Sequence, residues 1–325
     1  FQYTFFDKKG ETCFNGGAER YIKDLSNILK KLNYTPILIQ IGDKKQKREW
    51  VKNVNNLIVY GLPSKDVFDY CQKISFFKKY KFIIYSGVVF WNKKSLLHPN
   101  ILISHGITWD YPRSKKINNN DILNYFNDFD NLVSVDINTI SWLRTTFPNI
   151  FYNKKMFYIP NYVDNAIYKK NKKSSNNNIK IIFPRRACAE RGYWLVSKIL
   201  PIILNKYPNV YFDFIGFIHT DEIMDDIKYL IDLFLNRIKH YLAEPDEMPS
   251  FYESADISLI PTLYCEGTSL SCLEALASGN VVIATNIGGL PNLIIDGYNG
   301  ILINPDENEL IKALDRVINN KDLRD

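Results

Sequence analysis

Short apolar runs alternate with helical patterns along this chain, and the alternation runs through it twice. In the first half, the apolar runs that predict strands lie at residues 1–6, 36–41, 57–60, 81–85, 101–104 and 132–135. Between the first two, apolar residues recur every three or four positions from Ala18 to Leu32, which is the stripe of an amphipathic helix. Alternating strands and helices predict parallel sheets covered by helices on both faces.

The pattern restarts after a polar segment. The second half predicts strands at 179–183, 210–215, 256–260, 281–285 and 301–303, and helices at 193–206, 222–235, 270–278 and 307–319. We therefore predict an α/β fold of two Rossmann-like, doubly wound domains that face a central cleft. Residues 1–162 form the first domain, 163–178 the linker and 179–325 the second domain. Ligands of such sheets bind beyond the carboxyl ends of the strands.

Composition excludes several classes of protein. The chain has 325 residues, 46% of them hydrophobic and 23% charged, which suits two packed domains rather than a disordered chain. Its five cysteines are scattered, so we expect reduced thiols in a cytoplasmic protein, with neither a disulfide framework nor a zinc site. The longest apolar run, 82–91, is about half of the ~20 residues that a membrane span needs. No signal peptide is visible.

The segment 261–279 carries the most chemical information. It reads as the end of a strand, a loop with Glu266, and a helix that begins with Thr or Ser cap candidates and ends at Gly279. Unpaired N–H groups at a helix start can cradle a diphosphate. Glu266 would then face a reacting sugar and Glu274 a ribose. The alternative is that Ser271 and Glu274 form only a capping box and Glu266 is an ordinary loop carboxylate.

Glu266 and Glu274 also form a Glu-x7-Glu motif. The sequence around them closely resembles that of retaining glycosyltransferases of family four, which have the GT-B fold. The resemblance continues at 281–291 (VVIATNIGGLP) and at 296–300 (DGYNG). The resemblance implies two Rossmann-like domains and transfer of a sugar from a nucleotide-sugar donor.

The resemblance also implies roles for individual residues of this segment. Glu266 is implied to be the catalytic residue beside the donor sugar, where it stabilises positive charge or holds hydroxyl groups. Glu274 is implied to bind the nucleotide ribose. The backbone amides around Thr268, Ser269 and Leu270 are implied to hold the donor diphosphate.

A second matching segment, 183–192 (FPRRACAERG), follows the first strand of the second domain. The family usually shows Gly-Arg, a few residues, then Lys-Gly. The resemblance implies that Arg186 matches the Arg and that Arg191 stands where Lys is usual, both contacting the donor diphosphate. Cations there neutralise charge on a departing nucleoside diphosphate. Arg185 stands where Gly is usual and is either a third contact or a surface residue.

Two segments of the first domain resemble the family as well. Gly16 and Gly17 open the first helix, and the resemblance implies that this loop faces the donor diphosphate. His105 follows an apolar strand and resembles the family's histidine that contacts the donor sugar near the reacting centre. Asp110 would orient an acceptor hydroxyl or start a turn. Asn161 is interpreted as a structural residue at the domain junction.

The implied activity is retaining transfer of a sugar from a nucleotide-sugar donor to a glycan, lipid-linked or other hydroxyl acceptor, in polysaccharide biosynthesis. We expect no metal and no cofactor besides the nucleotide-sugar co-substrate. The sequence Asp128-Phe129-Asp130 is formally an Asp-x-Asp metal signature, but its polar surroundings predict carboxylates that face solvent.

The formal net charge of +6 and the lysines in 169–173 are compatible with peripheral contact at the inner face of the membrane. They do not indicate nucleic-acid binding, because aromatic residues are not interleaved with them.

Two other functions stay open at this stage. One is a nucleotide-sugar 2-epimerase, which shares the GT-B architecture, and the other is a non-catalytic module that binds a sugar nucleotide. Only six residues follow the helix predicted at 307–319, whereas the resembled family continues into helices that cross back onto the first domain. The chain is therefore expected either to be a fragment that lacks this crossover or to close its cleft differently.

Overall fold

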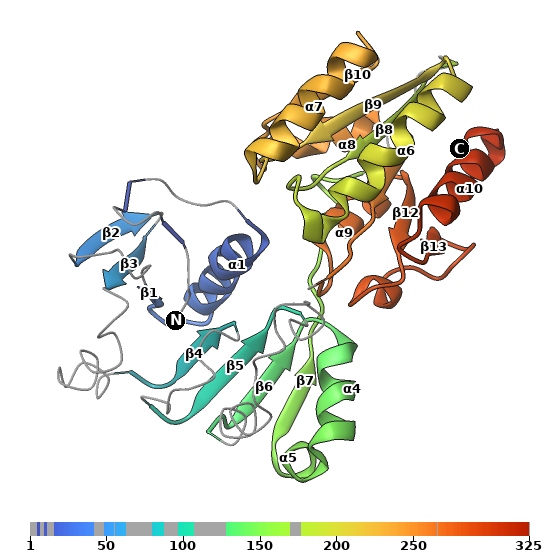
Figure 1. The fold of residues 1–325 in the computed structure, drawn as a ribbon. Helices are drawn as coiled ribbons and strands as arrows, with labels where there is room; N and C mark the ends of the chain where they lie inside the picture. The colour runs from blue at the N-terminus through green and yellow to red at the C-terminus, as the bar shows by residue number, and fades with distance from the viewer. Residues whose placement is uncertain are drawn as a thin grey trace. The chain divides into compact units, whose positions relative to one another are not determined.

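The computed structural model describes residues 5–6, 10–11, 16–41, 49–54, 56–62, 80–87, 97–106, 128–169, 177–264 and 266–324. They form two compact units, and the boundary between them lies between Pro160 and Asn161. The first is called unit 1 and the second unit 2 (Figure 1). Within the described ranges, no helix combines the length and the apolar character that crossing a bilayer requires.

Unit 2 is built on one parallel sheet of six strands. The strands are β8 (Ile179–Phe183), β9 (Val210–Ile215), β10 (Ile238–Tyr241), β11 (Ile257–Ile260), β12 (Val281–Thr285) and β13 (Ile301–Ile303). Their spatial order is β10-β9-β8-β11-β12-β13, which is the doubly wound order of Rossmann sheets. The predicted doubly wound domain is thus confirmed for this half of the chain.

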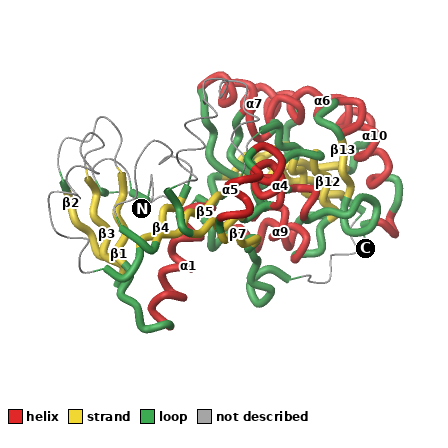
Figure 2. Tube along the Cα trace, turned by 90° about the horizontal axis from the view of Figure 1, so that it is seen from below, coloured by secondary structure: helices red, strands yellow, loops and turns green. Residues whose placement is uncertain are grey.

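Helices cover both faces of this sheet, because neighbouring residues of each strand point to opposite sides. Ile181 packs with α6 (Tyr193–Lys206), α7 (Asp221–Leu233) and α10 (Glu307–Ile318). Ile182 packs on the other face with α8 (Met248–Ser254) and α9 (Leu270–Ala277). Figure 2 shows α6, α7 and α10 on one side of strands β12 and β13 and α9 on the other.

Part of the segment predicted as a linker belongs to unit 2. The Tyr168 side chain is buried in the core that α8 and α9 form with the sheet, and Val163 packs against the same core. The apolar side chains of this segment therefore anchor the chain to unit 2 before its first strand begins.

Unit 1 contains two groups of strands. Strands β1 (Ile37–Ile41), β2 (Trp50–Val54) and β3 (Leu57–Leu62) pair in the order β1-β3-β2, and strands β4 (Ile83–Ser86), β5 (Asn100–Ser104), β6 (Asn131–Ser134) and β7 (Lys155–Tyr158) pair in sequence order. The described helices are α1 (Gly17–Lys31), α4 (Ile137–Thr146) and α5 (Pro148–Asn153). All pairs are parallel except β2 with β3.

Strand β2 departs from the prediction of purely parallel sheets. It forms an antiparallel hairpin with β3 in which Val54 pairs with Leu57, and Asn56 has a left-handed φ of 63°. Two-residue hairpins favour such backbone angles, which Asn tolerates well. Three of the five β2 residues are exposed, so this edge strand lacks the apolar run that marks a buried strand.

Candidate functional site

The strand order of unit 2 reverses between β8 and β11, which pair directly. In doubly wound sheets the loops that leave the carboxyl ends of two such strands diverge to opposite faces, and the crevice between them is the usual ligand site. Here the loop after β8 carries Arg185, Arg186 and Arg191, and the segment after β11 carries Thr262 and Glu266. The topology therefore brings the two segments singled out in the sequence to one place.

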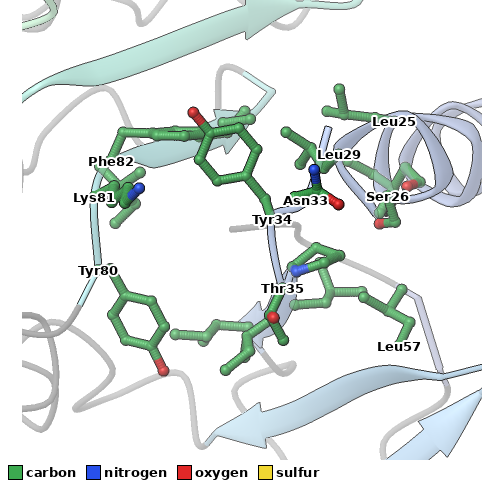
Figure 3. Close-up of a pocket in the computed structure, with 17 residues that line it drawn as sticks. Leu25, Ser26, Leu29, Asn33, Tyr34, Thr35, Leu57, Tyr80, Lys81 and Phe82 are labelled. Carbon is green, nitrogen blue, oxygen red and sulfur yellow. Dashed lines mark hydrogen bonds between the residues drawn. The ribbon is translucent and has the colours of Figure 1, made fainter. Parts of the chain in front are cut away.

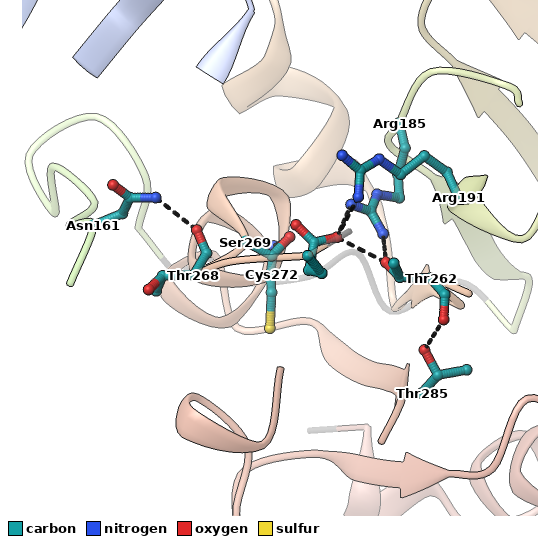
Figure 4. Close-up of polar contacts among 9 residues, drawn as sticks. Asn161, Arg185, Arg191, Thr262, Thr268, Ser269, Cys272 and Thr285 are labelled. Carbon is teal, nitrogen blue, oxygen red and sulfur yellow. Dashed lines mark hydrogen bonds and ion pairs between the residues drawn. The ribbon is translucent and has the colours of Figure 1, made fainter. Parts of the chain in front are cut away.

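The Glu266 carboxylate is held by three donors on a single oxygen. Arg185 Nη2 donates to Glu266 Oε2 at 2.5 Å, Arg191 Nη1 at 2.9 Å and Thr262 Oγ1 at 2.8 Å (Figure 4). Arg185 Nη1 also contacts Thr262 Oγ1, whose residue is completely buried. Glu266 Oε1 accepts no hydrogen bond from the residues that the structure describes. Among the described residues, the carboxylate is therefore fixed at one oxygen, and the other has no donor.

Electrostatics keep this carboxylate ionised. Burial alone would raise the pKa of the Glu266 carboxyl, but Arg185 and Arg191 outweigh the burial and hold that pKa below its usual range. The two guanidinium groups carry twice the charge of Glu266, so the cluster favours an additional anion. Arg185 Nε is buried without a hydrogen-bond partner among the described residues. A buried donor of this kind indicates a missing acceptor.

Two glycines brace the loop that carries Glu266. The Gly289 N–H donates to the Glu266 carbonyl at 3.1 Å. A Cβ on Gly288 would lie 2.3 Å from the Glu266 carbonyl oxygen, and one on Gly289 would lie 2.4 Å from the Gly267 carbonyl oxygen. The Gly-Gly pair after β12 is therefore required for close backbone approach, a role that the sequence resemblance alone does not reveal.

The amino terminus of α9 directly follows this loop. Ser269 caps it, with Ser269 Oγ accepting from the Cys272 N–H at 3.4 Å, and Asn161 Nδ2 donates to the Thr268 carbonyl at 2.7 Å. The first-turn amides of a helix have no partner within the helix, so those of Leu270 and its neighbours can meet an anion. Gly279 ends the helix with a φ of 72°, as expected of a left-handed cap.

The alternative interpretation of Ser271 and Glu274 as a capping box is wrong. Helix α9 begins at Leu270 and its cap is Ser269, so Ser271 lies inside the helix. Glu274 Oε2 instead accepts a hydrogen bond of 3.0 Å from the hydroxyl of Tyr252, a fully buried residue of α8. Sequence analysis missed Tyr252 because a lone tyrosine in an apolar setting looks like a core residue.

Arg185 and Arg186 lie in different surroundings although they are adjacent in the chain. Arg185, which the sequence left as either a contact or a surface residue, is buried against Glu266. Arg186, which the resemblance matched to the diphosphate-binding arginine, is exposed and makes no hydrogen bond or ion pair with a described residue. Its guanidinium group is therefore not part of the Glu266 cluster, and its contact with a diphosphate stays a prediction.

The predicted glycine loop of unit 1 precedes α1. Gly16 is the N-cap of α1 and Gly17 its first residue. A Cβ on Gly16 would lie 2.5 Å from Glu19 Oε2, so the buried Glu19 side chain folds back over the start of the helix. A donor diphosphate at this helix terminus would meet that carboxylate. The diphosphate contact of Gly16 and Gly17 stays a prediction.

His105 directly follows β5, as the sequence predicted. Its Nε2 lies 2.7 Å from Ser86 Oγ at the end of β4, and the Tyr21 ring of α1 meets it edge to face at 4.9 Å between centroids. Burial lowers the pKa of His105 to about 4, so the imidazole is neutral at physiological pH. A neutral imidazole can donate or accept a hydrogen bond to a sugar hydroxyl but supplies no charge.

We expect the low pKa of His105 to make unit 1 sensitive to acid. Unfolded His105 titrates near its ordinary value of 6.5, whereas the folded residue titrates at about 4. The unfolded state therefore binds more protons between these values, so stability is full above about pH 6.5 and is lost as pH falls toward about 4. Urea unfolding of unit 1 across this range, on the wild type and His105→Gln, measures the effect. A His105 resonance that titrates near pH 6.5 would contradict it, and His219→Gln, an exposed histidine, is the control.

Other predicted features lie away from the Glu266 cluster or outside the described residues. Asp130 Oδ2 accepts from the Asn100 N–H at 2.8 Å and lies 2.9 Å from His98 Nδ1, so it anchors the start of β5. Asp110 and residues 170–173 fall outside the described residues. The expectation that no metal is needed stays a prediction.

Unit 1 also contains a cavity of about 500 Å³ (Figure 3). It lies between the carboxyl-terminal half of α1 and the first residues of β1 and β4, and Leu25, Leu29, Tyr34 and Phe82 are among its lining residues. The cavity is mostly apolar and contains none of the predicted site residues. It lies at the amino ends of these strands, whereas His105 and Ser86 lie at carboxyl ends.

A known sequence family matches almost all of unit 2. The sequence family Glycosyl transferases group 1 matches residues 164–325. An uncharacterised glycosyltransferase of Haemophilus influenzae is 23% identical over 95% of this chain and 88% of its own length. The D-inositol 3-phosphate glycosyltransferase of Corynebacterium diphtheriae is 42% identical over a shorter match, which covers 18% of this chain and 14% of its own length.

Solved structures extend the likeness to the whole chain. Sucrose-phosphate synthase of Thermosynechococcus elongatus matches with a TM-score of 0.73 at 15% identity, over 99% of this chain and 90% of that one. Anabaena HepE, solved with UDP and glucose, matches with a TM-score of 0.71 at 16% identity over the same shares. At these identities the likeness shows the fold, so the predicted GT-B architecture is confirmed.

Proposed function

Residues 164–325 belong to the glycosyltransferase group 1 family, and on that premise we propose that this chain transfers a sugar from a nucleotide-sugar donor to a hydroxyl acceptor. The observation that carries the proposal is the buried cluster at the strand-order reversal. There Glu266 is ionised and fixed through one oxygen, directly before the amino terminus of α9. A nucleoside diphosphate fits the excess positive charge and the first-turn amides.

The proposed reaction uses few groups of this chain. The bond between the anomeric carbon and the diphosphate oxygen breaks, and its electron pair leaves with the nucleoside diphosphate. The acceptor oxygen bonds to the anomeric carbon on the same face, and its proton passes to the departing diphosphate oxygen. Glu266 stabilises positive charge on the sugar, while Arg191, Arg186 and the amides of Thr268, Ser269 and Leu270 stabilise the leaving group.

The proposed transfer retains configuration and needs no metal ion, because guanidinium groups and helix amides supply the positive field. Glu274 binds the ribose, and Tyr252 orients its carboxylate. The structural neighbour solved with UDP and glucose supports a donor of the UDP-sugar class. The acceptor is proposed to be a glycan or a lipid-linked glycan, with peripheral contact at the inner face of the membrane and a role in polysaccharide biosynthesis.

A thermal-shift panel of UDP-, GDP- and dTDP-sugars tests donor binding. Without metal, one nucleotide is expected to stabilise the protein by about 2.7 kcal/mol at 100 times its dissociation constant. Glu274→Ala is expected to lose most of this shift, because the ribose hydroxyls lose their acceptor. Glu307→Ala, at a residue of α10 whose side chain is about half exposed, is the matched control and should keep it.

Three results would contradict the proposal. The first is a shift that appears only with Mg²⁺, which would overturn metal independence. The second is the absence of any shift with every donor, which would overturn the donor site. The third is conversion of a donor into its 2-epimer without an acceptor, followed by NMR, which would indicate an epimerase instead of a transferase.

A further inference from the structure

Arg185 is an unusual cation for this site because it is almost completely enclosed. Its side chain is 6% exposed, whereas that of Arg191 is 27% exposed. It leaves the carboxyl end of β8 and contacts two polar groups of the segment after β11, Thr262 and Glu266. It thus ties together the two loops that the strand-order reversal places side by side.

The three donors on Glu266 Oε2 come from three separate segments. Arg185 follows β8, Arg191 belongs to the short helix η4 (Ala189–Arg191), and Thr262 follows β11. A carboxylate held by one donor can rotate about its side-chain torsion, but one held from three directions cannot. Thr262 is itself fixed, because its carbonyl accepts from Thr285 Oγ1 of β12 at 2.5 Å. The anchor is therefore rigid.

We infer that Arg185 is a positioning residue for Glu266: it locks Oε2 into the Arg185–Thr262 pair and so leaves Oε1 to face the donor sugar. The inference rests on the proposed function, because a fixed orientation of Glu266 matters for the reaction only if Glu266 faces a donor sugar. In this role Arg185 acts through Glu266; a contact of its Nε, unpartnered among the described residues, with a bound anion would be a separate, direct role, which the double-mutant cycle below measures.

The charges around Glu266 make this inference testable by pH. Among the described residues, the titratable groups that face the cluster are Arg185, Arg191, Cys272 and Tyr252. Burial raises the pKa of the Cys272 thiol to about 12, and burial also raises the pKa of Tyr252 well above its usual value. Neither titrates between pH 5 and 9. A pH dependence that appears in this window on removal of Arg185 therefore reports Glu266.

The decisive variants are Arg185→Met, which removes the charge and both donors, and Arg185→Lys, which keeps the charge alone. With the donor that the wild-type enzyme uses, Arg185→Met is expected to lower kcat by about 10- to 100-fold at neutral pH, because Glu266 is misplaced. Its activity should also fall as the solution becomes acidic, since burial then raises the pKa of Glu266. Arg185→Lys should restore a flat pH profile but only part of kcat.

A double-mutant cycle separates positioning from any direct role of Arg185. In a Glu266→Gln background, Arg185→Met is expected to change kcat by less than about threefold, because the residue it acts through is already altered. An equal loss in both backgrounds would overturn the inference. Arg316→Met, which removes an exposed arginine of α10, controls for net charge and should leave activity unchanged.

The outcomes distinguish this inference from the proposed function. If the wild type neither transfers nor hydrolyses any donor, the proposed function fails. If the wild type is active and Arg185→Met keeps its kcat and pH profile, only the positioning role fails. Thermal unfolding of each variant verifies folding. If Arg185→Met does not fold, Arg185→Lys decides: wild-type kcat in that variant would overturn the inference, because a lysine cannot hold both partners in the geometry of arginine.

Discussion

Replacement of Glu266 by Gln is expected to lower kcat for sugar transfer by about two to three orders of magnitude. The amide has the size of the carboxylate but no negative charge, so positive charge on the reacting sugar loses its stabilising partner. The change also leaves Arg185 and Arg191 without a counter-charge in a buried site. Donor binding should weaken much less, since the nucleotide contacts lie on other residues. Steady-state kinetics with saturating acceptor separates kcat from the donor KM.

The matched control for this variant is Glu307→Gln. Glu307 forms an ion pair with Lys198 in which both side chains are about half exposed, so its amide should leave kcat unchanged. A Glu266→Gln enzyme that keeps wild-type kcat would show that the carboxylate is structural. A raised donor KM with unchanged kcat would move Glu266 from the reacting carbon to the ground-state binding of the donor.

Replacement of Gly192 by Ala is expected to destabilise unit 2 by about 3–5 kcal/mol, the second large effect. Gly192 has a φ of 79°, and a Cβ there would lie 1.8 Å from the Pro261 carbonyl oxygen. The clash is with backbone rather than with a flexible side chain, so β11 or the start of α6 must shift. Calorimetry of the full chain should show the transition of unit 2 lowered by about 10 °C.

Gly297→Ala is the control for backbone strain alone. Gly297 has a nearly identical φ of 75°, but a Cβ there meets nothing within 4 Å. Its substitution should cost about 1–2 kcal/mol, the ordinary penalty for a left-handed alanine. Equal destabilisation by the two substitutions would mean that close packing against Pro261 contributes nothing.

The architecture of unit 2 could be predicted from the sequence for a physical reason. Strands that are buried on both faces must be apolar at every position, so runs such as Ile179–Phe183 stand out from the helices between them. Edge strands lack this mark. The exposed β2 (Trp50–Val54) therefore escaped prediction, and the Asn-Asn pair before Leu57 lacks the glycine that marks most two-residue hairpins.

The site was predictable in its segments but not in its side-chain contacts. The family resemblance singled out Glu266 and Arg191, whose Oε2 and Nη1 atoms the structure brings within 2.9 Å of each other. It assigned the arginine contact to Arg186 and left the role of Arg185 open, because adjacent residues beyond a strand point in different directions and only packing shows which one meets Glu266. The Tyr252–Glu274 contact joins two helices across 22 residues, and a contact at this sequence separation cannot be predicted from a local pattern.

The donors that surround Glu266 all lie in one uninterrupted stretch of chain. Asn161, which fixes the Thr268 carbonyl, and Thr285, which fixes Thr262, belong to the same compact unit. A gene segment that encodes residues 161–325 thus carries every described partner of Glu266 with it.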